Sequence, residues 1–183
     1  MEISDYIKVY KKRVNDSYCS TILKELETHV WGKHRFHNAY DQTTYSSPND
    51  LEVSFTNLSN HNDLMSLLWD TIREYVDGLS LPWFGSWNAY SAPRYNRYTV
   101  GSEMITHCDH IHSLFEGGNK GVPILSIVGL LNDDFKGGDF MMNDEKIDLG
   151  AGDILMVPSS FLYPHKVLKI TEGTRFSFVS WVW

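Results

Sequence analysis

The chain has 183 residues, of which 42 % are hydrophobic and 14 % aromatic, so it is long enough for one domain with a full core. This composition excludes a disordered chain, and a net charge of -7 disfavours nucleic-acid backbones and anionic membrane surfaces as partners. The two cysteines require no disulfide, and no apolar run is long enough for a membrane span or a signal-peptide core, so we expect a cytoplasmic protein.

The first half of the chain predicts two amphipathic helices. The first follows the candidate caps Asp16 and Ser17, and its apolar face consists of Cys19, Ile22, Leu23, Leu26 and Val30. The second follows polar residues 59–62, ends near Gly78, and has an apolar face that consists of Leu64, Leu67, Leu68, Ile72, Tyr75, Val76 and Leu79. We expect both helices to pack on a sheet.

The segment between the helices contains one further pattern. Residues 51–55 alternate between apolar and polar positions, which predicts a strand. Residues 38–50 are polar and rich in turn formers, which predicts a loop.

From residue 87 onward the hydrophobic period changes to two, with turn signals every eight to twelve residues. We expect strands near residues 87–91, 94–100, 102–109, 122–131, 138–142, 145–149, 153–157, 164–170 and 174–182. Short antiparallel strands of this number predict a jelly roll whose mouth can hold a metal and a small ligand. The sequence therefore predicts one mainly β domain over residues 1–183. Its helical support (1–86) is packed against a cupin-like double-stranded β-helix (87–183).

One of these expected strands ends with His107, Cys108 and Asp109. Because successive side chains of a strand point to opposite faces, His107 and Asp109 project the same way and can share one metal ion. A second histidine, His165, follows 58 residues after His107 and could complete the site from another strand. Two imidazoles and one carboxylate that leave other metal positions open are typical of non-haem Fe(II) oxygenases.

Arg175 begins the last expected strand, on which Arg175, Ser177, Val179 and Trp181 share one face. Both faces of this strand are mainly apolar, which predicts that both are covered. A guanidinium in such an interior is costly unless a carboxylate pairs with it, and its planar geometry suits bidentate pairing. The alternative is an exposed strand end, where Arg175 would lie beside Glu172.

Other residues near this pattern have plainer interpretations. His110 and His112 are rival metal ligands, but His110 faces away from Asp109 by strand alternation, and both precede a glycine-rich loop. Cys108 should point away from the metal and occupy a small core position. Residues 83–98, with arginines between aromatic residues, could stack on nucleic-acid bases, although sheet packing is favoured in an acidic chain.

Several short motifs follow one another in a fixed order in the second half of the chain. They are Tyr98-x-x-Gly101, His107-Cys108-Asp109, Leu131-Asn132-Asp133, Gly137-Gly138, Gly152-Asp153, Pro158-Ser159, His165 and Gly173-Thr174-Arg175-Phe176-Ser177. In this order and at these separations, residues 87–183 resemble the Fe(II)/2-oxoglutarate-dependent dioxygenase superfamily. Within it they are most similar to the prolyl 4-hydroxylase-like branch, which includes small phage-encoded members.

The resemblance implies an Fe(II) site formed by His107, Asp109 and His165. It further implies that Arg175 and Ser177 bind the distal carboxylate of the cosubstrate 2-oxoglutarate, and that Tyr98 donates another hydrogen bond to it. With dioxygen, and with ascorbate as a candidate reductant, such an enzyme hydroxylates a substrate C–H bond and converts 2-oxoglutarate into succinate and CO2. The favoured substrate is a prolyl residue of a peptide or protein.

The sequence departs from this branch at two positions. Prolyl hydroxylases commonly have a tyrosine where this chain has Met104, and some have another where it has Leu130. Polar contacts to 2-oxoglutarate must then come partly from elsewhere, and Ser126 and Thr106 are candidates.

The substrate remains open at this point. One alternative is the same chemistry on a free amino acid, another small molecule or an alkylated base. Another is a jelly-roll metal- or ligand-binding module without catalysis. Loops at residues 38–50 and 110–121 are candidates to close over a substrate.

Overall fold

In the computed structural model, which describes residues 2–38, 43–47, 49–84, 87–109 and 121–183, two antiparallel β-sheets face each other. The larger sheet has the strand order β1 (Lys8–Tyr10), β12 (Ile154–Pro158), β8 (Leu125–Leu130), β15 (Arg175–Val182), β6 (Arg94–Tyr98), β5 (Glu52–Ser54) and β2 (Gly32–Lys33). The smaller sheet has the order β11 (Glu145–Ile147), β10 (Phe140–Met142), β13 (His165–Val167) and β7 (Met104–His107). Two short pairs accompany them, β14 (Ile170–Glu172) with β9 (Lys136–Gly137), and β3 (Phe36–Asn38) with β4 (Thr43–Tyr45).

Two hydrophobic cores lie on opposite faces of the larger sheet. Between the sheets, Val128 of β8 belongs to the same core as Phe140 of the smaller sheet. On the other face, Ile127 of β8 and Phe178 of β15 belong to a core that includes Leu68 of a helix. Because Ile127 and Val128 are consecutive, their side chains point to opposite faces of the strand, and all six residues of β8 are buried. The larger sheet is therefore a covered central layer.

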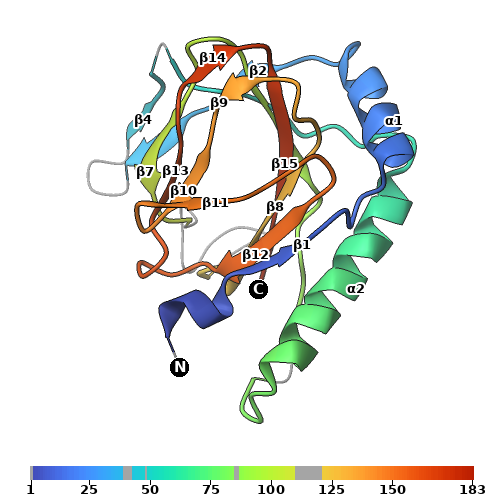
Figure 1. Cartoon of the computed structure of the whole chain (residues 1–183), viewed down its shortest axis with the longest axis vertical. Coiled ribbons are helices and arrows are strands. Elements are labelled where there is room, and N and C mark those ends of the chain that lie inside the picture. Colours follow the sequence, from blue (N-terminus) through green and yellow to red (C-terminus); the bar gives the residue numbers. More distant parts are fainter. Residues whose placement is uncertain (1, 39–42, 48, 85–86, 110–120) are drawn as a thin grey trace.

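The helix α1 (Asp16–Leu26) is the first of two helices on the outer face of the larger sheet (Figure 1). The predicted caps Asp16 and Ser17 are instead its first two residues, and the cap is Asn15, whose side chain accepts a hydrogen bond from the backbone amide of Tyr18. The prediction that Val30 belongs to its buried face is wrong. The helix ends at Leu26, and Val30 is 89 % exposed.

The helix α2 (His61–Leu79) covers the same face of the sheet (Figure 1). Its buried residues recur at helical spacing and are Leu64, Leu68, Thr71, Ile72, Tyr75 and Val76. It ends at Ser80, whose backbone adopts a left-handed conformation with φ of 52°. The hydroxyl of Tyr75 donates to the carbonyl of Tyr6, which ties the N-terminal 3-10 turn (Ile3–Tyr6) to the helix. Within the described ranges, no helix is long and apolar enough to cross a membrane.

The N-terminal half contributes strands to the larger sheet as well as helices. The sequence predicted only residues 51–55 as a strand before residue 87, whereas β1, β2 and β5 all join this sheet. Part of the predicted loop at residues 38–50 is also a strand, β4, which pairs with β3. Strands of two or three residues are too short to show a period of two, so the local pattern could not reveal them.

Two of the predicted C-terminal strands are interrupted. Residues 87–91 form only an isolated bridge between Tyr90 and Val182, although the backbone amide of Ser91 donates to the carbonyl of Trp181. Residues 164–170 are divided between β13, which pairs with β7, and the start of β14, which pairs with β9. Between β13 and β14 the chain passes from one pairing strand to another, and the alternation of apolar and polar residues continues through this change without marking it.

Candidate metal and cosubstrate site

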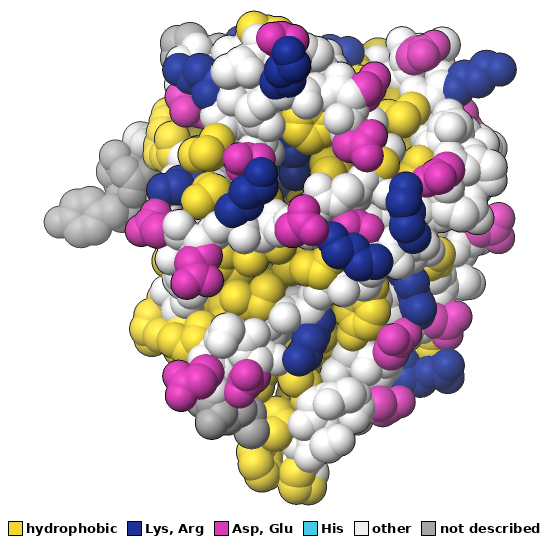
Figure 2. All heavy atoms as spheres, viewed as in Figure 1, with side chains coloured by type: hydrophobic (Ala, Val, Ile, Leu, Met, Phe, Trp, Pro, Cys, Tyr) yellow, Lys and Arg dark blue, Asp and Glu magenta, His cyan; other side chains and the backbone are white. Residues whose placement is uncertain are grey.

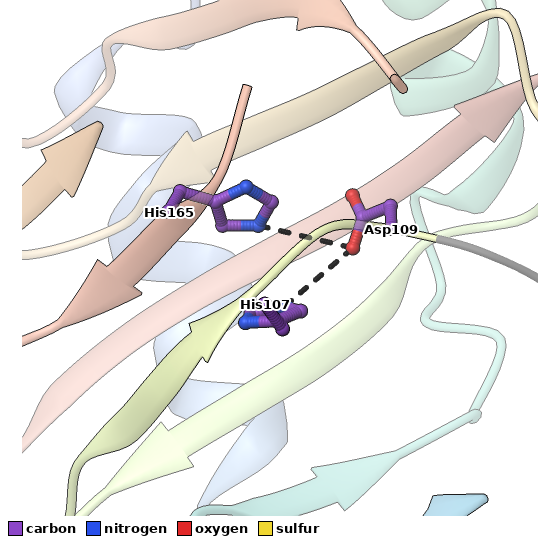
Figure 3. A group of neighbouring side chains, drawn as sticks. All are labelled: His107, Asp109 and His165. Carbon is purple, nitrogen blue, oxygen red and sulfur yellow. Dashed lines mark ion pairs between the residues drawn. The ribbon is translucent and has the colours of Figure 1, made fainter. Parts of the chain in front are cut away.

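Three side chains that can bind a metal converge at the end of the β7–β13 pair (Figure 3). His107 is the last residue of β7, His165 is the first of β13, and the two are register partners. His107 Nε2 lies 3.6 Å from Asp109 Oδ1, and His165 Nε2 lies 3.8 Å from the same oxygen. One potential ligand atom from each residue lies within 4.8 Å of the others, so a single metal ion can bind all three.

Both imidazoles are oriented by their own backbone. His107 Nδ1 lies 2.9 Å from the carbonyl oxygen of Ile105, and His165 Nδ1 lies 3.1 Å from that of Tyr163. When Nδ1 carries the proton and donates to these carbonyls, Nε2 is left as the acceptor that faces Asp109. Phe140 stacks on His165, with ring centroids 5.4 Å apart and planes 18° apart. This anchoring of the second ring nitrogen is common among metal-binding histidines.

Asp109 is held in its charged form. Ser126 Oγ donates to Asp109 Oδ2 at 2.5 Å, and Ser159 Oγ lies 2.5 Å from Ser126 Oγ. Burial by itself would raise the pKa of Asp109, but the interactions with His107 and His165 and the hydrogen bond from Ser126 outweigh burial and lower that pKa. Burial also lowers the pKa of His165. A charged carboxylate and a neutral imidazole are the forms that bind metals.

Arg175 is buried and has no carboxylate partner among the described residues. Its side chain is 1 % exposed, its Nη1 donates to Ser177 Oγ at 3.0 Å, and its Cζ lies 5.2 Å from the centre of the Tyr98 ring. Nε of Arg175 has no hydrogen-bond partner among the described residues. The alternative of an exposed strand end beside Glu172 is wrong, because Glu172 instead forms an ion pair with Lys136. A buried guanidinium without a counter-charge is costly, so this arrangement fits an anionic ligand.

Two cavities border the metal triad. The inner pocket has a volume of about 30 Å³ and is lined by Tyr98, Arg175 and Ser177, among other residues. The outer cavity has a volume of about 390 Å³. His107 and Asp109 line both of them. A metal bound by the triad would therefore face the inner pocket on one side and the outer cavity on the other.

Two polar residues of the inner pocket, Arg94 and Asn96, are not among the site residues predicted from the sequence. They precede Tyr98 by four and two residues on β6, so strand alternation places all three side chains on one face, and all three line the inner pocket. Arg94 also lines the outer cavity. Counting back from Tyr98 in steps of two would have found them. The composition of residues 83–98 predicts only that they pack in a sheet.

The remaining candidate residues lie at different distances from the site. The hydroxyl of Ser126 bonds to the triad carboxylate, whereas Thr106 is exposed and is absent from the lining of either cavity. The prediction of a core position for Cys108 is wrong, because Cys108 is only partly buried and lines the outer cavity. His110 and His112, with the loop that follows them, lie outside the described residues, so their roles stay predictions.

The residues of this site lie within a segment that matches a known protein family. Residues 93–183 match the sequence model of the 2OG-Fe(II) oxygenase superfamily, and this range contains the whole triad and Arg175. Residues 93–183 belong to the 2OG-Fe(II) oxygenase superfamily.

Curated relatives of this superfamily member include bacterial PKHD-type hydroxylases. The one from Idiomarina loihiensis is 36 % identical over 91 residues, and one from Stenotrophomonas maltophilia is 31 % identical over 99 residues. These matches cover 48 % and 51 % of the chain, but 39 % and 43 % of the relatives. The chain thus spans less than half the length of the curated relatives it matches.

Solved prolyl hydroxylases share the fold. The viral collagen prolyl hydroxylase of Paramecium Bursaria Chlorella virus-1, in its 2OG complex, has a TM-score of 0.70 at 13 % identity and covers 99 % of this chain and 98 % of its own. A Trichoplax adhaerens prolyl hydroxylase was solved in complex with a peptide fragment of the hypoxia inducible factor oxygen degradation domain. It has a TM-score of 0.70 at 14 % identity, and the match covers 98 % of this chain and 84 % of the Trichoplax chain. The likeness in fold therefore extends to the residues before 93.

Proposed function

We propose that this chain is an Fe(II)- and 2-oxoglutarate-dependent hydroxylase that acts on a prolyl residue of a peptide or protein. Its superfamily supports the reaction type, and its fold neighbours support the substrate class, since they include prolyl hydroxylases and one complex with a peptide fragment. When bound, iron and 2-oxoglutarate supply, with dioxygen, the chemistry that hydroxylates a C–H bond and yields succinate and CO2.

The observation that carries this proposal is a buried arginine that has no carboxylate partner among the described residues. Arg175 lines the same pocket as the metal triad, and its Nε has no partner among the described residues. Arg175 and Ser177 would bind the distal carboxylate of 2-oxoglutarate through charge-assisted hydrogen bonds, with Tyr98 packed beside the guanidinium. The residues that would hold the iron are His107, Asp109 and His165.

The outer cavity offers a place for a prolyl side chain next to the triad. Its aromatic lining includes Phe36, Phe55 and Trp181, and Phe55 is 74 % exposed. A proline ring is compact and apolar, so it can pack on such rings while the flanking peptide stays outside the cavity. This observation supports a peptide substrate that presents a single residue.

Arg175→Gln tests the cosubstrate site. The substitution should weaken 2-oxoglutarate binding roughly 10- to 100-fold, because hydrogen bonds to a charged group contribute about 1.5–3 kcal/mol. Metal affinity should stay unchanged, since all three ligands remain. Anaerobic titration of the Fe(II)-loaded protein with 2-oxoglutarate, followed by the visible charge-transfer band of the chelate, measures the first effect. Competition with a chelator measures the second.

Arg97→Gln is the matched control, because Arg97 lies on β6 and forms an ion pair with Glu52 instead of lining either cavity. Equal 2-oxoglutarate affinities in the wild type and Arg175→Gln would place Arg175 outside the cosubstrate site. Succinate release should increase with proline-containing peptides and be lost in Asp109→Ala. Tight 2-oxoglutarate binding without any such increase would contradict the prolyl substrate.

A further inference from the structure

Arg94 lies between the two cavities, beside the metal triad. Its side chain lines both cavities. Nε of Arg94 donates to Asn96 Oδ1 at 3.1 Å, and Cζ of Arg94 lies 5.0 Å from the centre of the Trp181 ring. These contacts hold the guanidinium from two sides. In the part of the chain that the structure describes, its two terminal nitrogens form no hydrogen bond, so the edge that suits a carboxylate is open.

Arg94 forms no ion pair with an acidic side chain among the described residues, and its electrostatic interaction is with Asp109 of the triad. Three other arginines, Arg13, Arg73 and Arg97, each form an ion pair with an aspartate or glutamate. Burial lowers the pKa of Arg94, but a guanidinium remains protonated at neutral pH. Asp109 is the only described acidic residue in the lining of either cavity, and a metal bound to it would neutralise its charge. With a metal bound to Asp109, Arg94 would present a positive charge that no other described acidic residue of the cavity linings compensates.

Basic side chains outnumber acidic ones among the described residues that line the outer cavity. Lys33 and Arg35 line it together with Arg94. Burial and the charge of Arg94 lower the pKa of His34, which also lines the cavity, to about 4, so that imidazole is neutral at pH 7. On the molecular face in Figure 2, by contrast, acidic and basic side chains are intermixed. The cavity thus favours an anionic group although the chain has a net charge of -7.

Arg94 and Arg175 are placed to bind different anions. Arg175 lies opposite Tyr98 of β6, and Arg94 lies four residues before Tyr98, a separation of about 13 Å along the strand. Arg94 contacts Trp181, and Trp181 is the register partner of Ser126, which bonds to the triad carboxylate. Arg94 is therefore at the metal end of the inner pocket, and Arg175 is at the far end.

We propose that Arg94 binds a carboxylate of the substrate, so that the enzyme prefers peptides with an acidic group next to the oxidised residue. This inference rests on the proposed function, which supplies the peptide and assigns Arg175 to 2-oxoglutarate. The carboxylate can come from an acidic side chain or from a chain terminus. Both would form the same paired hydrogen bonds with the open edge of the guanidinium.

Binding to Zn(II)-loaded protein with saturating 2-oxoglutarate tests this without turnover. The probes are trifluoroacetyl-Gly-Pro-Asp-Gly-amide with its Asn counterpart, and trifluoroacetyl-Gly-Pro with its amide, titrated by fluorine NMR. The first pair tests a side-chain carboxylate, and the second pair tests a terminal one. In at least one pair, the wild type should bind the carboxylate about tenfold or more tightly than the amide, given the usual strength of hydrogen bonds to charged groups.

The substitution Arg94→Gln should abolish that preference, Arg94→Lys should restore part of it, and Arg97→Gln should leave it intact. The affinity for 2-oxoglutarate should be unchanged in Arg94→Gln. Equal affinities for carboxylate and amide probes in the wild type, or no probe binding at all, would overturn the inference while the proposed function stands. A loss of 2-oxoglutarate affinity in Arg94→Gln as large as in Arg175→Gln would assign Arg94 to the cosubstrate. A wild type that fails to bind 2-oxoglutarate would overturn both proposals.

Discussion

Asp109 is positioned by serine hydroxyls that belong to another sheet. Ser126 is on β8 of the larger sheet and Ser159 directly follows β12, whereas Asp109 follows β7 of the smaller sheet. Hydrogen bonds to a ligating carboxylate fix its orientation, and their removal typically lowers metal affinity 10- to 100-fold. The packing of the two sheets against each other therefore helps to orient the carboxylate of the metal site.

The substitution Ser126→Ala should lower Zn(II) affinity about tenfold, because Asp109 loses the hydroxyl that orients its second oxygen. Competition with a chromogenic chelator measures the affinity, and circular dichroism checks that the fold is retained. Ser91→Ala removes the hydroxyl of another serine pair, Ser91 with Ser180, outside the metal site and serves as the control. Equal Zn(II) affinities in Ser126→Ala and the control would rule out this orienting role.

At the scale of elements, the pairing of β8 with β15 depends on one small residue. Gly129 is the register partner of Phe178, and a Cβ added at Gly129 would lie 2.1 Å from Cζ of the phenyl ring. The ring therefore occupies the space above the glycine. This contact is at the centre of the larger sheet, in the core that joins the sheet to the helices.

Gly129→Ala should lower the free energy of unfolding by about 1–3 kcal/mol, because the added methyl overpacks this core. Combining it with Phe178→Leu should cost less than the sum of the two single changes, since the smaller side chain relieves the clash. Urea denaturation of the wild type, the two single variants and the double variant measures the coupling free energy between the two positions. Gly78→Ala on α2, where an added Cβ meets nothing within 4 Å, should not destabilise the protein. Strict additivity would contradict the proposed contact.

The elements differ in how far the sequence alone could predict them. Long periodic segments were predictable: α2 and β15 both show repeating apolar positions, and β15 places Ser177 and Val179 toward the inner pocket and Phe178 toward the helices. Short elements were not predictable. β1 pairs with β12 near the other end of the chain, and three residues carry too little periodicity to indicate such a pairing.

For the whole molecule, the proposed ligands should act as stabilisers. They would bring a cation to Asp109 and an anion to Arg175, which forms no ion pair among the described residues, and they bind the folded state. A ligand at 100 times its Kd adds about 2.7 kcal/mol to the free energy of unfolding. Zn(II) should therefore raise the Tm of the wild type, and 2-oxoglutarate should raise it further.

The pattern across variants makes this thermal-shift prediction specific. Arg175→Gln should keep the response to Zn(II) and lose most of the additional response to 2-oxoglutarate. Asp109→Ala should lose both responses, because the cosubstrate would chelate a metal that is no longer held. A response to 2-oxoglutarate without metal, of the same size in all three proteins, would indicate binding elsewhere.

Residue order was enough to predict the local directions of the side chains: His107 and Asp109 on one face of a strand, Arg175 with Ser177 on one face of another, and the apolar face of α2. These follow from the periods of strands and helices, which involve only neighbouring residues. Three features follow from tertiary packing: His165 meets the other two ligands, Arg175 is buried with no acidic partner among the described residues, and Arg94 lines two cavities. Those arrangements depend on which distant segments pair and pack, and local patterns do not encode the choice of partner.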